Sequence, residues 1–181
     1  MIRGVIPLYL CYNATVEFPK NGGLTLIYYL IAALVILLDQ ITKWLVATQM
    51  EIAQRIPIIE NVLYITSHRN KGAAFGILQG QMWFFYIVTF IAVIAVIYFM
   101  QKEGKHEKLY GTSLALILGG ALGNFIDRLF RGEVVDFVDT YIFGYSFPIF
   151  NVADSALCIG VGLLFLKMIL DERKAKKGNN K

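Results

Sequence analysis

Four long apolar stretches, each nearly free of charge, constrain this 181-residue chain more than any other feature. A helix of about 20 apolar residues crosses a bilayer with every backbone polar group hydrogen-bonded within the helix. The chain is 57% hydrophobic and 17% charged, against roughly 45–50% and 25% in soluble domains, which is too apolar for a water-soluble fold. We therefore predict an all-α membrane protein whose four transmembrane helices span about 24–48, 80–100, 109–126 and 154–171.

Lysine and arginine are distributed unevenly among the segments that flank these spans. Of the 17 basic residues, 11 lie before the first span, in the loop after the second span, or from Lys167 onward. Short cytoplasmic segments carry the excess of positive charge, so we expect both termini in the cytoplasm. The basic tail, 173–181, is then a cytoplasmic orientation signal, and we expect no nucleic-acid partner.

Two segments, about 49–81 and 127–153, then lie on the opposite side of the membrane. Within the first, 61–68 combines β-branched and aromatic residues between turn-forming residues, which is typical of a strand or hairpin. We predict a small extracytoplasmic β-sheet there. We expect one domain over 24–172, preceded by a loose leader or misassigned start over 1–23, where prolines interrupt any helix.

Aspartates gather near the outer ends of the predicted spans. They are Asp39, Asp127, Asp136, Asp139 and Asp154. Inserting a charged residue within a span costs about 2.5–3.5 kcal/mol of free energy, so a functional role is the first interpretation of these aspartates. Asp136 lies between two apolar residues and needs a partner, whereas we expect Asp139 to face water. A structural alternative stays open for Asp39, which shares a helix face with Lys43 and can neutralise it.

Two further acids have structural alternatives of the same kind. Asp127 can form an anchoring ion pair with the adjacent Arg128 at the end of the third span. Asp154 can stabilise the start of the fourth helix by complementing its dipole, with Asn151 as the capping residue. Close helix packing is the interpretation for the small residues 119–123, because they lie inside a span.

Other chemistries find less support in the sequence. His68 and His106 lie on opposite sides of the membrane, so we expect no histidine-based metal site and no cofactor. Cys11 and Cys158 do not form a redox motif. A serine–lysine dyad remains an alternative. Its candidates are Ser67 and Ser155 with Lys43 and Lys71.

Two other classes of membrane protein compete with an enzyme. A small proton-coupled transporter also uses short helices and an intramembrane carboxylate, but its key charge lies near the bilayer midplane, often within an inverted repeat. Here the acids lie toward one membrane surface and no repeat is visible. A membrane scaffold with structural charges does not explain Asp136.

Five short blocks of residues, in order along the chain, resemble the bacterial lipoprotein signal peptidases, or signal peptidase II. The blocks are Asp39-Gln40-Ile41-Thr42-Lys43, Asn70-Lys71-Gly72-Ala73-Ala74-Phe75-Gly76, Gly120-Ala121-Leu122-Gly123-Asn124-Phe125-Ile126-Asp127-Arg128, Val134-Val135-Asp136-Phe137 and Phe150-Asn151-Val152-Ala153-Asp154. The chain departs from the family pattern before residue 24, because family members usually enter the first helix almost at once.

The resemblance implies an aspartic endopeptidase of the bacterial cytoplasmic membrane, with its active site near the extracytoplasmic face. Its substrates are diacylglyceryl-modified prolipoproteins, cleaved on the N-terminal side of the lipidated cysteine, and the peptide antibiotic globomycin binds it. Asp136 and Asp154 match the catalytic pair. Positions that support the site or contact substrate or inhibitor match Asp39, Lys43, Asn70, Gly72, Asn124, Asp127, Arg128 and Asn151.

The chemistry of such a pair follows from its charges. Two facing carboxyl groups cannot both ionise cheaply, so they share one proton, one acting as base and the other as acid. The residues alone leave open which of the two is protonated. Membrane lipid delivers the substrate laterally, and Arg128 and Asn124 are candidates to hold its backbone or headgroup oxygens.

Overall fold

Four long helices and a small sheet make up the protein in a computed structural model that describes residues 22–72, 78–104 and 107–178. In chain order the elements are α1 (Gly22–Gln49), β1 (Arg55–Ile59), β2 (Leu63–Asn70), α2 (Met82–Lys102), α3 (Lys108–Arg131), β3 (Val134–Ile142), β4 (Tyr145–Ser146) and α4 (Val152–Gly178). All four helices are long and apolar enough to cross a membrane. The predicted class, four membrane-spanning helices with a small sheet, is confirmed.

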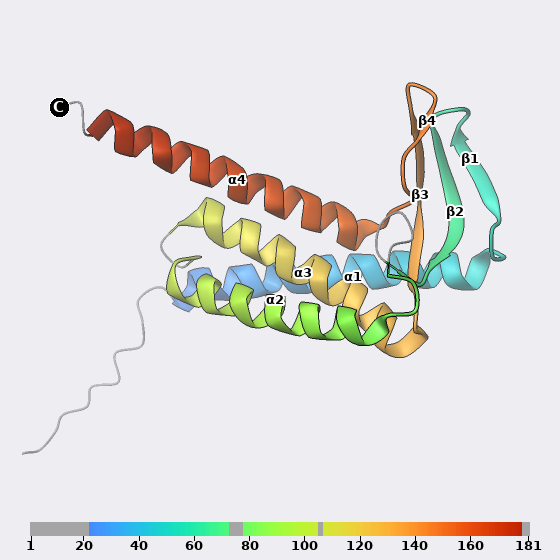
Figure 1. The fold of residues 1–181 in the computed structure, drawn as a ribbon, viewed down its shortest axis with the longest axis horizontal. Helices are drawn as coiled ribbons and strands as arrows, with labels where there is room; N and C mark the ends of the chain where they lie inside the picture. Colours follow the sequence, from blue (N-terminus) through green and yellow to red (C-terminus); the bar gives the residue numbers. More distant parts are fainter. Residues whose placement is uncertain (1–21, 73–77, 105–106, 179–181) are drawn as a thin grey trace, which may run out of the picture.

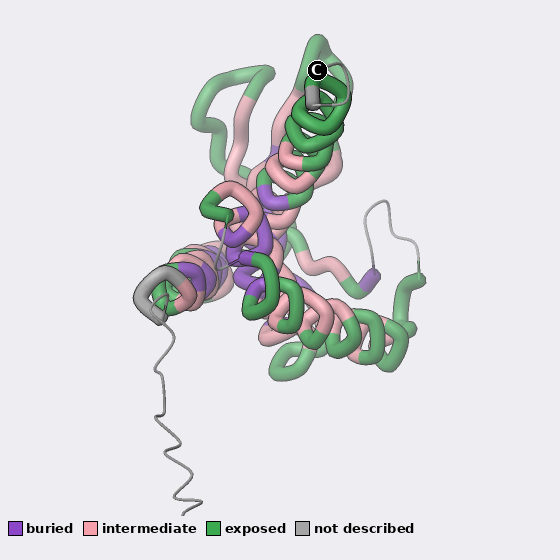
Figure 2. The backbone as a smooth tube through the Cα atoms, turned by 90° about the vertical axis from the view of Figure 1, so that its left-hand side faces the viewer, coloured by how far each residue is buried: buried purple, intermediate pink, exposed green. Residues whose placement is uncertain are grey.

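The helices lie side by side, and the sheet stands across one end of the bundle (Figure 1). Residues 1–21 of the predicted leader lie outside the described residues, and α1 begins at Gly22. Figure 2 shows buried residues gathered where the helices meet and exposed residues on the outer faces. Those outer faces are largely apolar, with Phe90 and Phe165 among the exposed side chains, as expected for helices that contact lipid.

α3 lies at the centre of the bundle, where small residues allow close approach. A Cβ at Gly119 would lie 2.9 Å from the carbonyl oxygen of Ala32 in α1, and one at Gly120 would lie 2.4 Å from that of Ala153 in α4. Only a residue without a side chain fits such contacts between backbones. The prediction that residues 119–123 pack helices together is confirmed.

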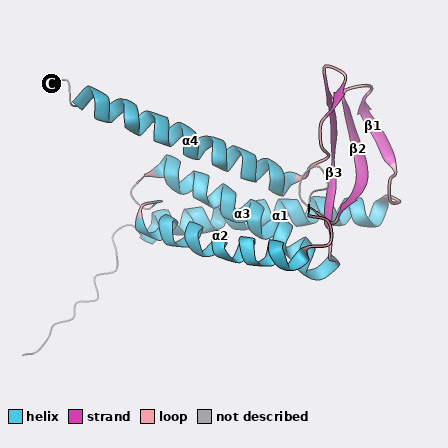
Figure 3. Ribbon diagram, viewed as in Figure 1, coloured by secondary structure: helices cyan, strands magenta, loops and turns pink. Residues whose placement is uncertain are grey.

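The sheet is antiparallel with strand order β1-β2-β3-β4, and its strands run across the direction of the helices (Figure 3). The strand or hairpin predicted over 61–68 is confirmed: the range contains the turn and most of β2, which pairs with β1. β2 pairs in turn with β3, which places His68 opposite Asp136. The sheet therefore joins the segment after α1 to the segment between α3 and α4.

Candidate active site

A fully buried ammonium group, that of Lys43, organises one side of the site. Its Nζ atom lies 2.8 Å from Asp39 Oδ2, 3.2 Å from Asp127 Oδ2 and 2.9 Å from Asn124 Oδ1. An ammonium has three donors, and all three are used here. The predicted neutralisation of Asp39 by Lys43 is therefore confirmed. The backbone N–H of Ala153 also donates to Asp39 Oδ1 over 2.9 Å, which ties the start of α4 to α1.

The expected ion pair between Asp127 and Arg128 is wrong. Asp127 instead pairs with Lys43 and, over 3.7 Å, with Arg131 one helical turn onward. Neighbouring residues on a helix point in different directions, so a carboxylate reaches the side chain four residues away and not the next one. The Arg128 guanidinium lies 4.4 Å from the ring centre of Phe85, and its Nη2 donates to the Gly72 carbonyl over 3.3 Å.

Asp136 lies on β3 with each of its carboxyl oxygens bound to a side-chain amide. Asn151 Nδ2 donates to Oδ1 over 2.6 Å, and Asn70 Nδ2 donates to Oδ2 over 2.9 Å. The Asn70 amide oxygen accepts the N–H of Gly72, which fixes the orientation of that amide. The pKa of Asp136 is raised to about 6. Burial is the largest cause and the nearby charge of Asp154 adds to it, while the two amide donors act in the opposite direction.

Asp154 and Asn151 form a reciprocal cap at the start of α4. Asn151 Oδ1 accepts the backbone N–H of Asp154 over 2.9 Å, and Asp154 Oδ2 accepts the backbone N–H of Asn151 over 3.2 Å. This is the arrangement of a capping box, and it confirms the predicted helix start. Asn124 Nδ2 also donates to Asp154 Oδ1 over 2.7 Å. Both carboxyl oxygens of Asp154 thus accept an N–H group, one from the backbone and one from a side-chain amide.

Asn151 links the two acids that the sequence singled out. It is fully buried, donates to Asp136, caps the helix that carries Asp154, and donates to Asn124 Oδ1 over 3.2 Å. Asn124 in turn accepts from Lys43. The Asn124 amide oxygen thus accepts two hydrogen bonds, and its nitrogen donates one of its two N–H groups to Asp154 while Asn124 also lines the cavity described below. Asp136 and Asp154 are separated along the network by a single side chain.

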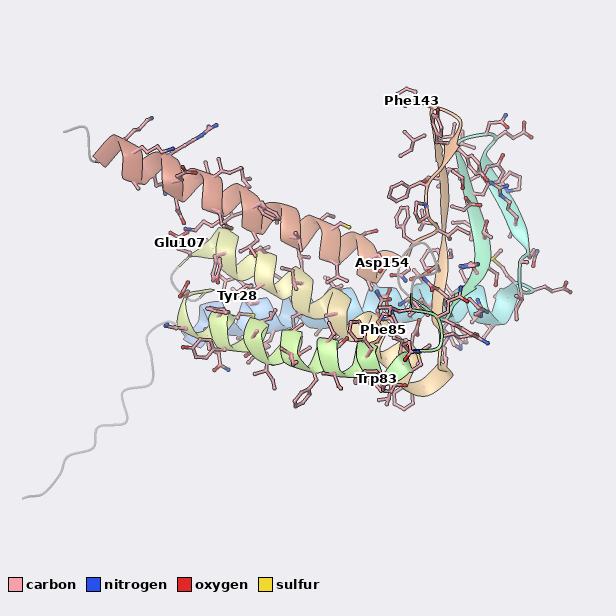
Figure 4. All side chains as sticks on the ribbon, in the orientation of Figure 1. Tyr28, Trp83, Phe85, Glu107, Phe143 and Asp154 are labelled. Atoms are coloured by element: carbon pink, nitrogen blue, oxygen red, sulfur yellow. The ribbon has the colours of Figure 1, made fainter. Side chains whose placement is uncertain are left out.

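A cavity of about 740 Å³ opens where α4 meets the sheet, and both acids line it. Figure 4 shows Asp154 at this junction. Basic side chains line part of the wall, and apolar ones line the segment that leads into α4. They are His68, Arg69, Lys71 and Arg128, and Phe147, Pro148, Ile149, Phe150 and Leu157. The cavity therefore combines two acids with cationic and apolar walls.

Two polar residues lie in surroundings that their local sequence does not predict. Asp139, expected to face water, is buried: Thr66 Oγ1 donates to it over 2.8 Å and Arg55 Nε lies 3.1 Å away. Pairing of β1, β2 and β3 covers it, which no local pattern indicates. Gln40 was not singled out, yet its Nε2 donates to Asp39 Oδ2 and to the Gly123 carbonyl, each over 3.1 Å. An uncharged amide beside a charge within a span is the signal that could have found it.

The serine–lysine alternative has no support in these contacts. Ser155 Oγ donates to the Asn151 carbonyl, and Ser67 Oγ accepts from Arg69. The three donors of Lys43 are already paired. Among the described residues, no group of three or more histidine, cysteine or acidic side chains is arranged to hold a metal ion.

The structure brings all ten predicted site residues into the network or to the cavity wall. They lie on α1, β2, α3, β3 and α4, with Gly72 just after β2 and Asn151 just before α4. Residues 73–76 of the second block lie outside the described residues. The sharing of one proton between the two acids and the contacts with substrate stay predictions.

Comparison with known proteins gives a consistent result. The family model described as signal peptidase (SPase) II matches residues 31–170. A lipoprotein signal peptidase of Halalkalibacterium halodurans is 71% identical over 155 residues, covering 86% of this chain and 99% of the relative. Two solved structures of a bacterial membrane enzyme, obtained in meso at 2.3 Å and 1.9 Å, are each 51% identical. They superpose with TM-scores of 0.78 and 0.73, covering 81% and 78% of this chain and 89% and 92% of theirs. The chain therefore belongs to the signal peptidase II family of membrane proteases.

Proposed function

We propose that this protein is an aspartic endopeptidase that removes the signal peptide from diacylglyceryl-modified prolipoproteins, cleaving on the N-terminal side of the lipidated cysteine. One observation carries the proposal. Asn151 donates to Asp136 and caps the helix that bears Asp154, so both acids line one cavity at the end of a membrane bundle. The curated relative is a lipoprotein signal peptidase, which supports the same substrate class.

The two acids differ in their hydrogen-bond partners and surroundings, which assigns them different roles in the proposal. Burial raises the pKa of Asp136 to about 6, which favours its protonated form relative to an ordinary carboxyl. Asp154 lies in the first turn of α4, where its two carboxyl oxygens accept N–H groups and do not donate, as the oxygens of a base do. In the proposed resting state Asp136 is therefore the acid and Asp154 the base.

Hydrolysis then follows from this assignment. The oxygen of a water molecule attacks the scissile carbonyl carbon while Asp154 takes a proton from that water. Asp136 gives its proton to the carbonyl oxygen. When the C–N bond breaks, protonated Asp154 gives the proton to the departing nitrogen. Asp136 recovers a proton from one hydroxyl of the intermediate as the new carboxyl group forms. Both acids end in their starting states.

The walls of the cavity suit a substrate that arrives from lipid. A signal peptide is an apolar helix, and each buried methylene of the attached acyl chains adds about 0.8 kcal/mol of membrane affinity. The apolar segment 147–150 offers a surface to such chains, and Arg128 lies where it can hold backbone or headgroup oxygens. The proposed orientation places this cavity at the extracytoplasmic surface, and globomycin is the inhibitor expected to compete for it.

Cleavage of a lipid-modified prolipoprotein peptide by purified protein in detergent tests the proposal. Asp136→Asn and Asp154→Asn are each expected to abolish cleavage, because an amide can neither hold the shared proton nor accept one. Asp139→Asn is the matched control, since Asp139 is a buried acid of the same strand that does not line the cavity. Globomycin is expected to block the parent enzyme.

Retained turnover in either the Asp136 or the Asp154 variant would remove that residue from the pair. Equal loss in the Asp136, Asp154 and Asp139 variants would mean that these acids are needed for structure and not for chemistry. Thermal unfolding of each variant separates that outcome from a chemical defect.

A further inference from the structure

The turn between β3 and β4 carries an aromatic residue in an unfavourable backbone conformation. Tyr141 pairs with Ser146 and Ile142 with Tyr145, so the turn is the dipeptide Phe143-Gly144. Both residues have positive φ, 50° and 83°. Such two-residue turns strongly prefer asparagine, aspartate or glycine at the first position, and a bulky side chain there is strained. Phe143 is also 98% exposed.

The β1–β2 turn of the same sheet has a polar residue where its backbone has positive φ. Leu63 pairs with Thr140, so the β1–β2 turn lies at the same end of the sheet as the β3–β4 turn. There the residue with positive φ is Asn61, at 62°, and its neighbour is Glu60. This is the turn chemistry expected in water. The same end of the sheet thus carries one turn with polar residues, Glu60 and Asn61, and one turn with an aromatic residue.

The surroundings of Phe143 are apolar well beyond the turn. No residue from 140 to 151 is charged, although this segment lies outside the helices that span the membrane. Tyr145 is 81% exposed, and Ile142 and Phe147 are about half exposed. Exposed aromatic residues without charged neighbours are typical of the boundary between lipid headgroups and acyl chains.

The β3–β4 turn lies where the boundary between lipid headgroups and acyl chains is expected. In Figures 1 and 4 the β3–β4 turn projects to the side of the bundle past α4, at the end where Asp154 and Trp83 also lie. Trp83 is an exposed aromatic residue at the start of α2, where a membrane-spanning helix reaches the surface. β4 is one edge of the sheet and β1 is the other, which separates the aromatic turn from the strand that leads to the polar one.

We propose that the tip of the β3–β4 hairpin, residues 142–145, inserts into the lipid interface on the cavity side of the membrane. Contact with lipid would offset the free-energy cost of exposing the Phe143 ring and of its strained backbone. A strained residue persists only where its surroundings provide such compensation. The same segment continues into 147–150, which lines the cavity. The tip therefore fixes one cavity wall at the depth of the headgroups. This inference needs the membrane orientation of the helices but not the catalytic pair.

Fluorescence quenching in vesicles tests the insertion. Phe143→Trp is reconstituted into phosphatidylcholine vesicles whose acyl chains are brominated near the headgroup, and its emission is compared with that of the parent protein. Tyr145→Trp is a second reporter at the tip with an ordinary strand backbone, so the test survives if the first variant misfolds. Val62→Trp is the matched control, since Val62 is apolar and about half exposed in the polar turn.

Both tip tryptophans are expected to lose fluorescence in the brominated vesicles, and the control tryptophan is expected to keep it. Unquenched emission from both tip variants would overturn the proposal, and so would equal quenching at residue 62. If the tip contacts a second protein instead of lipid, emission from both tip variants would stay unquenched. Because no cleavage is measured, the outcome is independent of the proposed peptidase mechanism.

Discussion

The hydrogen bond from Lys43 fixes the orientation of the Asn124 side-chain amide. The ammonium faces the amide oxygen, so the amide nitrogen faces Asp154 and must donate to it. A reversed amide would place its NH₂ group against Lys43, donor against donor. The buried cluster around Lys43 therefore contributes to the site by orienting one hydrogen bond on Asp154.

Replacing Lys43 tests how much stability this cluster provides. Lys43→Met leaves Asp39 and Asp127 buried with most of their compensating charge removed, so we expect the free energy of unfolding to fall by about 3–5 kcal/mol. Lys167→Met is the control, because Lys167 pairs with Glu107 and Asp171, which are both exposed. Exposed pairs contribute about 0–1 kcal/mol. Chemical denaturation in micelles measures both, and equal losses would contradict this account.

The pH dependence of cleavage tests the assignment of the proton to Asp136. The alkaline limb of kcat/KM is expected near pH 6, where the free enzyme loses this proton. The Asn70 amide stabilises the ionised carboxylate and so lowers its pKa. Asn70→Ala removes that donor, the pKa of Asp136 rises, and the alkaline limb is expected to move to higher pH.

A neighbouring position on β2 provides the control for this pH profile. Thr66 donates to Asp139, which does not line the cavity, so Thr66→Val should leave the limb where it is. A limb that moves equally in both variants would indicate a general change in the sheet. A limb that moves to lower pH in Asn70→Ala would contradict the assignment.

At the scale of elements, the contact between α3 and α4 depends on the absence of side chains. A Cβ at Gly160 would lie 2.8 Å from Ile117 Cγ1 and 2.8 Å from the Ser113 carbonyl, whereas one at Gly162 meets nothing within 4 Å. We expect Gly160→Ala to lower the free energy of unfolding by about 1–3 kcal/mol through overpacking. Gly162→Ala should be neutral or slightly stabilising, since alanine is a better helix former.

Thermal unfolding of the two glycine variants measures the difference directly. They lie two residues apart on one helix, so the change in helix propensity is the same in both, and only the buried glycine, Gly160, faces α3. Equal unfolding temperatures would show that α4 moves away from α3 at little cost.

The elements differ in how far the sequence could predict them. Helices and the β1–β2 hairpin follow from local patterns, because hydropathy and turn residues are properties of short segments. The pairing of β2 with β3 joins residues that are distant in the sequence, and the burial of Asp139 beneath Arg55 depends on it. The pairing of Asp127 with Lys43 likewise needs α1 beside α3, which no local pattern shows.

At the scale of the whole molecule, membrane orientation remains a prediction from the distribution of basic residues. Single cysteines at Glu60, in the β1–β2 turn, and at Lys174, in the last part of α4, test it in a background without Cys11 and Cys158. A membrane-impermeant maleimide applied to intact cells should label position 60 and not position 174. The reverse pattern would place the cavity on the cytoplasmic side.

Asp136 and Asp154 lie on the last two long elements of the chain. Three of the four helices have therefore been synthesised before either acid. Neither carboxyl acquires its partner until the carboxy-terminal helix docks against the rest. The proposed hydrolytic machinery is thus inert throughout biogenesis, and a truncated nascent chain has no means of cutting its neighbours.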